Sequence, residues 1–198
     1  MSDTPTRDAK LVQFLNEAYA KEKQLETSLA AHADATMRED YAKRLKDHLK
    51  ETRSHAAQVA RRIKQLGGTP ETVSVPGPEG LGRMAETMSE KLGKAKAAAQ
   101  GPLHAMRGAG EQEQMLRNAR AEYADEAQEI ATYMVIDSLA TTVGDKETAK
   151  LARAIIREEE RMQKFLADLL PDLTAGVAHD EIPISELPDT PARTPANA

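Results

Sequence analysis

Four glutamates fall on or beside the apolar faces of predicted helices, where a carboxylate is unexpected. Glu22, Glu126 and Glu159 continue stripes of hydrophobic residues spaced by three and four, and Glu51 lies at the edge of another stripe. A buried, unpaired carboxylate costs on the order of several kcal/mol, so such groups are ion-paired, protonated or bound to metal. Any one of them alone most simply pairs with an arginine or lysine. One from each of four helices can meet inside a bundle, where two divalent cations would neutralise a total charge of about −4.

Two more residues extend this set. Glu129 follows Glu126 by about one helical turn, so both carboxylates could bind one metal, and pairing with an arginine is an equally good interpretation. His55 follows Glu51 by four residues and therefore points the same way. Neutral imidazole is a good ligand for iron, manganese or zinc, but a histidine on an apolar stripe is as readily a hydrogen-bonded core residue. The candidate metal ligands are Glu22, Glu51, His55, Glu126, Glu129 and Glu159.

Other residues are expected around the site rather than in it. His48, one turn before Glu51, is expected to support the ligands. Arg53 and Arg161 are expected on the surface, and the alternative is that they pair with bundle carboxylates. His32 is also expected at the surface. Three tyrosines are expected to border the site as core residues with hydrogen-bonded hydroxyl groups: Tyr19, Tyr123 and Tyr133.

A short internal repeat selects the same glutamates as the hydrophobic spacing. The pattern Tyr-Ala-x-Glu-x-Gln occurs at residues 19–24 and again at 123–128. The pattern Glu-x-Arg-x-His at 51–55 is similar to Glu-x-Arg-x-Gln at 159–163. We therefore expect two similar helical hairpins related by a pseudo-twofold axis. That symmetry would place Glu22 opposite Glu126, and Glu51 opposite Glu159.

Hydrophobic spacing and turn residues predict the elements that position these side chains. Helices are expected over residues 8–33, 37–66 and 111–143, and a fourth helix from an N-cap at Asp145 to Leu170, where Pro171 ends it. The connection over 70–110 is long and is expected to contain a short helix at 84–99. A helix of about 30 residues is ~45 Å long, so a connection of this length can return along the bundle. One such crossover, between the second and third helices, is the ferritin-like connectivity.

Composition supports an all-α protein and excludes several classes of site. Aromatic residues make up only 3% of the chain, which disfavours a β-sandwich. There is no cysteine, which rules out disulfides and thiolate metal sites. The net charge of −5 and the lack of a long apolar run argue against nucleic-acid and membrane partners and favour the cytoplasm. We expect one bundle domain over residues 1–171 and a flexible, proline-rich tail over 172–198.

The quoted motifs resemble the YciE/YciF family of ferritin-like bacterial stress proteins. The resemblance rests on four stretches: Tyr19–Leu25, His48–Thr52, Glu129–Tyr133 and Glu158–Glu159. It implies a ferritin-like bundle with a di-metal carboxylate site at the candidate glutamates, a role in stress, and a homodimer. The chain departs from the Glu-x-x-His pattern of better-known di-iron bundles, because Ser54 and Met162 stand where that pattern has histidine.

Two functional hypotheses follow from the sequence. The first is a stress-response protein that binds two iron or manganese ions, with zinc as a further candidate, and that oxidises them with oxygen or peroxide. The second is a metal-free structural or interaction bundle in which the glutamates form internal salt bridges. The motifs leave open whether the protein is an enzyme.

Overall fold

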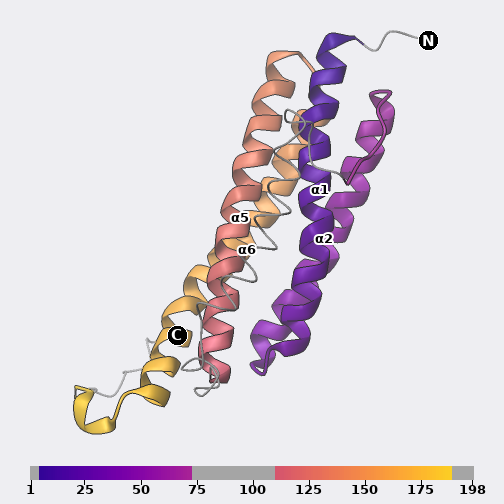
Figure 1. The fold of residues 1–198 in the computed structure, drawn as a ribbon. Helices are drawn as coiled ribbons and strands as arrows, with labels where there is room; N and C mark the ends of the chain where they lie inside the picture. Colours follow the sequence, from indigo (N-terminus) through magenta and orange to yellow (C-terminus); the bar gives the residue numbers. More distant parts are fainter. Residues whose placement is uncertain (1–4, 73–109, 189–198) are drawn as a thin grey trace, which may run out of the picture.

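The computed structural model describes residues 5–72 and 110–188, and four long helices make up most of these two ranges (Figure 1). No strand occurs in the described part of the chain. The prediction of an all-α bundle is therefore confirmed. The helices are α1 (Thr6–Ala35), α2 (Glu39–Gln65), α5 (Glu111–Thr142) and α6 (Lys146–Glu181), and a single 3-10 turn, η1 (Ile184–Glu186), follows them.

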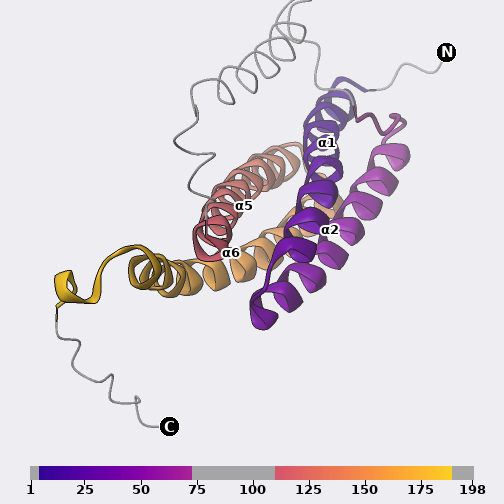
Figure 2. The same ribbon diagram turned by 60° about the horizontal axis from the view of Figure 1, so that its bottom comes forward.

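The helices form two antiparallel hairpins, α1 with α2 and α5 with α6, which pack against each other (Figure 2). In Figure 1, α2 ends at the top of the bundle and α5 begins at the bottom. The chain must therefore return along the whole bundle between them. This is the predicted ferritin-like crossover, and it places α5 beside α1 and α6 beside α2. The short helix predicted at 84–99 lies outside the described residues.

Two glycines shape the turns at the upper end. Gly67, after α2, has a φ of 81°, and Gly144, between α5 and α6, has a φ of 77°, a region where residues with a Cβ are strained. The side chain of Asp145 then accepts a hydrogen bond from the backbone N–H of Thr148, as expected of an N-cap. Arg62 of α2 donates to Asp145 at 2.6 Å and so joins the two hairpins at this end.

The hydrophobic core is divided into separate clusters. A lower cluster packs the end of α1 and the start of α2 against the start of α5 and the last half of α6. An upper cluster packs the opposite halves of the four helices. The buried acidic and histidine side chains described below come from the helical turns between these two clusters. Apolar layers therefore separate them from both ends of the bundle.

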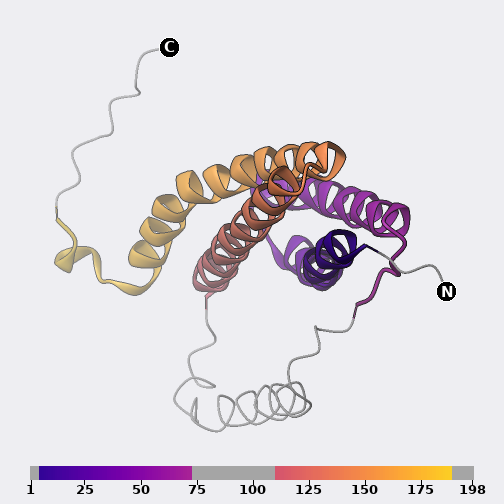
Figure 3. The same cartoon turned by 90° about the horizontal axis from the view of Figure 1, so that it is seen from above.

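The predicted end of the fourth helix at Leu170 is wrong. Helix α6 continues through Pro171 to Glu181, so the start of the predicted flexible tail is helical. Leu169 and Leu173, on either side of the proline, are both buried in the lower cluster. Their burial offsets the backbone hydrogen bond that proline cannot donate, and α6 bends in its C-terminal part, as Figure 3 shows. Within the described ranges no helix is long and apolar enough to cross a bilayer.

Candidate metal centre

Six titratable side chains from all four helices converge in the middle of the bundle. Each of these side chains is buried, with residue exposures of 2% or less. They are Glu22 of α1, His48 and His55 of α2, Glu126 and Glu129 of α5, and Glu159 of α6. We refer to these six residues as the central cluster. The prediction that glutamates on the apolar stripes meet in the interior is confirmed for Glu22, Glu126 and Glu159.

Five of the six residues form two groups with the spacing of metal ligands. One group is Glu22, His55 and Glu159, and the other is His48, Glu126 and Glu159, each with ligand atoms within 4.8 Å of one another. Glu159 belongs to both groups. Its Oε1 lies 2.8 Å from His55 Nδ1, and its Oε2 lies 3.6 Å from His48 Nε2. A carboxylate placed in this way can bridge two cations.

Each buried imidazole also contacts a carboxylate at the rim of the cluster. The Nδ1 atom of His48 lies 3.0 Å from Glu51 Oε2, and the Nε2 atom of His55 lies 2.6 Å from Glu158 Oε2. A carboxylate that accepts from one ring nitrogen fixes the tautomer and leaves the other nitrogen free to bind metal. The free nitrogens, His48 Nε2 and His55 Nδ1, are the two that face the central cluster.

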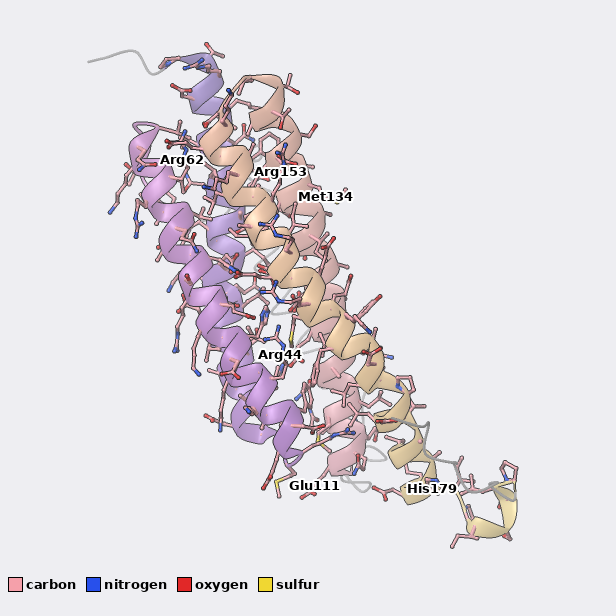
Figure 4. The ribbon with its side chains drawn as sticks, turned by 180° about the vertical axis from the view of Figure 1, so that it is seen from behind. Arg44, Arg62, Glu111, Met134, Arg153 and His179 are labelled. Carbon is pink, nitrogen blue, oxygen red and sulfur yellow. The ribbon has the colours of Figure 1, made fainter. Side chains whose placement is uncertain are left out.

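Two arginines hold the rim carboxylates between α2 and α6. Arg44 donates to Glu51 at 3.0 Å, and Figure 4 shows Arg44 on the face where α2 and α6 lie side by side. Arg161 Nη2 lies 4.0 Å from Glu51 Oε1 and 3.8 Å from Glu158 Oε1. Arg161 is exposed, as predicted, and it also reaches both rim carboxylates, which was the alternative prediction.

Of the three tyrosines expected at the site, Tyr133 contacts the cluster. Its hydroxyl donates to Glu22 Oε1 at 2.6 Å, and burial raises the pKa of Tyr133 well above its ordinary value. Tyr19 is half-buried against the upper apolar cluster, and Tyr123 is exposed on the outside of α5. The sequence prediction for Tyr123 is therefore wrong, because Glu122 and Glu129 occupy the inner face of α5.

The cluster leaves polar atoms without partners. Nine buried side-chain atoms of the described residues have no hydrogen bond, and eight of them belong to the central cluster. Four of the eight, the inner nitrogens of His48 and His55 and both oxygens of Glu159, still face an oppositely charged group at 2.8–3.6 Å. Both oxygens of Glu129 have no hydrogen-bond partner among the described residues. Buried polar groups nearly always have hydrogen-bond partners. This number of buried atoms without a hydrogen bond, close to one another, fits a site that binds cations.

The pKa values show how strongly this site disfavours ionised carboxylates that have no counter-charge. Burial raises the pKa of Glu22 to about 8 and that of Glu126 to about 7. Burial, together with the charges of Glu22 and Glu159, raises the pKa of Glu129 well above 4.5. Burial would also raise the pKa of Glu159, but the adjacent His55 imidazole and the charges of both histidines outweigh burial and lower the pKa.

The histidines shift in the opposite sense to that expected from burial alone. Burial would lower the pKa of His48, but the Glu126 carboxylate 3.1 Å away and the hydrogen bond with Glu51 raise it to about 10. Burial would lower the pKa of His55 as well, but the Glu159 carboxylate 2.8 Å away and the charge of Glu22 raise it to about 9. Glu51, bonded to His48, has a pKa lowered to about 2. Without metal, protons and imidazolium ions therefore balance the carboxylate charge.

A comparison with protein families assigns the chain to a family. The family described as "domain of unknown function (DUF892)" matches residues 6–178, which include all four bundle helices except the last turn of α6. The chain belongs to the DUF892 family. No curated protein sequence matches it significantly.

Solved structures share the fold of this DUF892 protein. A protein from Xanthomonas campestris pv. campestris is 23% identical with a TM-score of 0.66, covering 88% of this chain and 97% of that one. The E. coli stress protein YciF is 21% identical with a TM-score of 0.60, covering 86% and 98%. A Desulfovibrio desulfuricans bacterioferritin, described with a diiron site, is 20% identical with a TM-score of 0.62, covering 88% and 86%. The predicted resemblance to the YciE/YciF group and the ferritin-like fold are confirmed.

The DUF892 structure arranges the predicted ligands differently from the sequence expectation. Glu51 is the one predicted ligand outside the buried cluster, because its side chain is 27% exposed and lies at the rim. His48, expected to play a supporting part, takes the inner place. Glu159 therefore faces the two histidines rather than Glu51. Sequence reasoning also missed Glu158, the rim partner of His55, although its position beside Glu159 was a usable signal.

Proposed function

We propose that the central cluster binds two divalent transition-metal ions, iron or manganese, with zinc as a further candidate. The observation that supports this most strongly is the convergence of six buried carboxylate and imidazole side chains from four helices, five of which form two groups with ligand atoms within 4.8 Å of one another. Four carboxylates supply a charge of about −4, which two divalent ions neutralise. Imidazole and carboxylate together suit iron and manganese, and the chain offers no competing thiolate.

The residues divide naturally between two ions. Glu22 and His55 would hold one ion, His48 and Glu126 the other, and Glu159 would bridge them. Glu129 is buried, feels the charges of Glu22, Glu126 and Glu159, and would supply a further carboxylate. The bound metals would supply electron exchange with oxygen or peroxide. Tyr133 orients Glu22 through its hydroxyl, and the apolar clusters above and below restrict access of water.

The relatives support a biological setting for this chemistry. YciF is described as a stress protein, and the bacterioferritin is described with a diiron site. We infer a role for this chain in handling iron or peroxide under stress. We also expect a cytoplasmic homodimer, as the sequence predicts, and light scattering coupled to size-exclusion chromatography would measure the dimer directly.

Titration with Mn²⁺ or anaerobic Fe²⁺ tests the proposed function. We expect about two ions per chain for the wild type, and near-complete loss of binding in the double variant Glu22→Ala plus Glu126→Ala, because each group loses a ligand. Glu113→Ala, a partly exposed glutamate on α5 that pairs with Arg117, is the matched control and should bind as the wild type does. Equal binding by the double variant would contradict the proposal.

One observation favours the metal-free alternative. His48 Nε2 lies 3.1 Å from Glu126 and His55 Nδ1 lies 2.8 Å from Glu159, so protonated histidines can neutralise much of the cluster. In that case the protein would be a structural or interaction bundle. Exhaustive chelation discriminates the two functions, since a melting temperature unchanged by chelation and by added Mn²⁺ supports the metal-free bundle.

A further inference from the structure

Glu122 of α5 is the one buried acidic residue of the described ranges that lies outside the central cluster. It is 3% exposed, and its neighbours in space include the lower apolar cluster. Its Oε2 accepts a hydrogen bond from the Tyr41 hydroxyl at 2.5 Å, and its Oε1 lies 2.7 Å from His32 Nδ1. A leucine would pack here without any desolvation cost, so the carboxylate needs a reason other than packing.

Glu122 begins a row of acids that leads into the centre. Glu122, Glu126 and Glu129 follow one another at steps of four and three residues, and all three are buried on the inner face of α5. Side chains at these steps are neighbours on a helix, with Cβ atoms roughly 6 Å apart. The outer end of the row touches His32, whose side chain is 26% exposed. The row therefore joins a partly exposed imidazole to the central cluster.

We propose that His32 and Glu122 form the loading route by which divalent cations reach the central cluster. This inference rests on the proposed di-metal function. A cation that leaves water loses its hydration, and a buried carboxylate beside a partly exposed imidazole replaces part of that hydration. Negative charge along a path of low dielectric also concentrates cations and raises their rate of arrival. Glu122 would pass an ion to Glu126, one helical turn further in.

The opposite approach, between α2 and α6, is less suited to cations. Its rim carboxylates Glu51 and Glu158 are held by the guanidinium groups of Arg44 and Arg161. Both guanidinium groups are partly exposed, and Figure 4 shows Arg44 on this face, so an ion arriving here meets positive charge. The partners of Glu122 are a neutral hydroxyl and an imidazole, which in its neutral form can itself bind a cation.

The kinetics of Co²⁺ binding test this route, with visible absorption of the bound ion as the readout. We expect Glu122→Gln to slow Co²⁺ uptake by a factor of about ten. The release of Co²⁺ to excess chelator should slow by the same factor. The dissociation constant and the stoichiometry should stay unchanged, because a residue on the path alters only the barrier. Glu113→Gln on the same helix is the control and should leave both rates unchanged.

The outcomes separate the route from other roles of Glu122. Unchanged rates in Glu122→Gln would overturn the proposal, and so would a weaker dissociation constant with unchanged uptake, which would make Glu122 a ligand. If Glu122→Gln fails to fold, His32→Leu replaces it, since His32 is partly exposed. His32→Leu should slow Co²⁺ uptake and release by the same factor, and unchanged rates would again overturn the route. A wild type that binds no Co²⁺ would instead contradict the proposed di-metal function.

Discussion

At the scale of single residues, the candidate metal centre depends on two histidines whose two ring nitrogens face different partners. His48 and His55 each direct one nitrogen to a rim carboxylate and the other to the central cluster. The rim partner fixes which nitrogen carries the proton, so the inner nitrogen is available to a metal. The same imidazoles, when protonated, neutralise the carboxylates in the absence of metal. The site is thus arranged to exchange protons for metal ions.

Glu129→Gln tests this exchange at the residue that has no partner of its own. Both Glu129 oxygens lack hydrogen bonds, and its pKa is raised by burial and by Glu22 and Glu159. The neutral amide should therefore keep or raise the melting temperature of the metal-free protein, while metal affinity falls by roughly tenfold or more. Thermal unfolding after chelation and calorimetric Mn²⁺ titration measure the two effects. A loss of stability with unchanged affinity would contradict this role.

Helix geometry explains which site residues the sequence could predict. Glu22, Glu126 and Glu159 interrupt clear apolar stripes, and all three are buried. Residues advance by about 100° around a helix, so Glu51 lies about 60° from His48, whereas His55 lies only about 20° from it. The spacing therefore put His48 and His55 on one face and Glu51 at its edge, but it could not show which of the three contact the other glutamates. That choice depends on the rotation of α2 against α6, which tertiary packing sets.

At the scale of the elements, one arginine links the hairpins at the upper end of the bundle. Arg62 of α2 donates to Asp145 at 2.6 Å, to Thr148 Oγ1 at 2.8 Å and to Glu147 at 3.0 Å. Its side chain is mostly buried, and it lies where α2 meets the start of α6 (Figure 4). The three bonds hold the α5–α6 turn against the end of α2.

Arg62→Ala should therefore lower the free energy of unfolding by about 1–3 kcal/mol, because hydrogen bonds between charged groups are lost and Asp145 keeps only its capping bonds. Urea denaturation of the chelated protein measures the change. Arg61→Ala, an exposed neighbour, is the control and should change the free energy of unfolding by less than about 0.5 kcal/mol. Equal effects of the two substitutions would show that the link contributes nothing specific.

The elements themselves followed well from the sequence, with one exception. The spacing of Leu15, Leu25 and similar residues fixes the helices, and the turn at Gly144 is marked by its residue types. Pro171 was interpreted as a helix end because local rules disfavour proline in a helix interior. Burial of Leu169 and Leu173 on both sides overrides that preference. Such an override depends on packing between distant segments, which local sequence does not contain.

At the scale of the whole molecule, the buried charges predict how stability depends on pH. The pKa of Glu22 rises from 4.5 to about 8 on folding, and that of His48 from 6.5 to about 10. The folded state therefore binds more protons than the unfolded state between these values, and stability falls as pH rises. The lowered pKa of Glu51, about 2, affects stability only at more acidic pH.

The metal-free protein should accordingly melt at a lower temperature at about pH 9 than at about pH 6, by roughly 5 °C or more. Metal affinity should rise over the same range, because bound protons must leave before the ligands bind metal. Differential scanning calorimetry with and without Mn²⁺ measures both. A melting temperature that rises with pH in the chelated protein would contradict the charge assignment.

The central claim is that side chains from four helices hold two cations on a shared glutamate. A crystal grown with Mn²⁺, and analysed by anomalous scattering, tests it most directly. We expect two strong peaks inside the bundle, one beside Glu22 and His55 and one beside His48 and Glu126, with Glu159 between them. Peaks confined to surface carboxylates, or no peak inside the bundle, would contradict the claim.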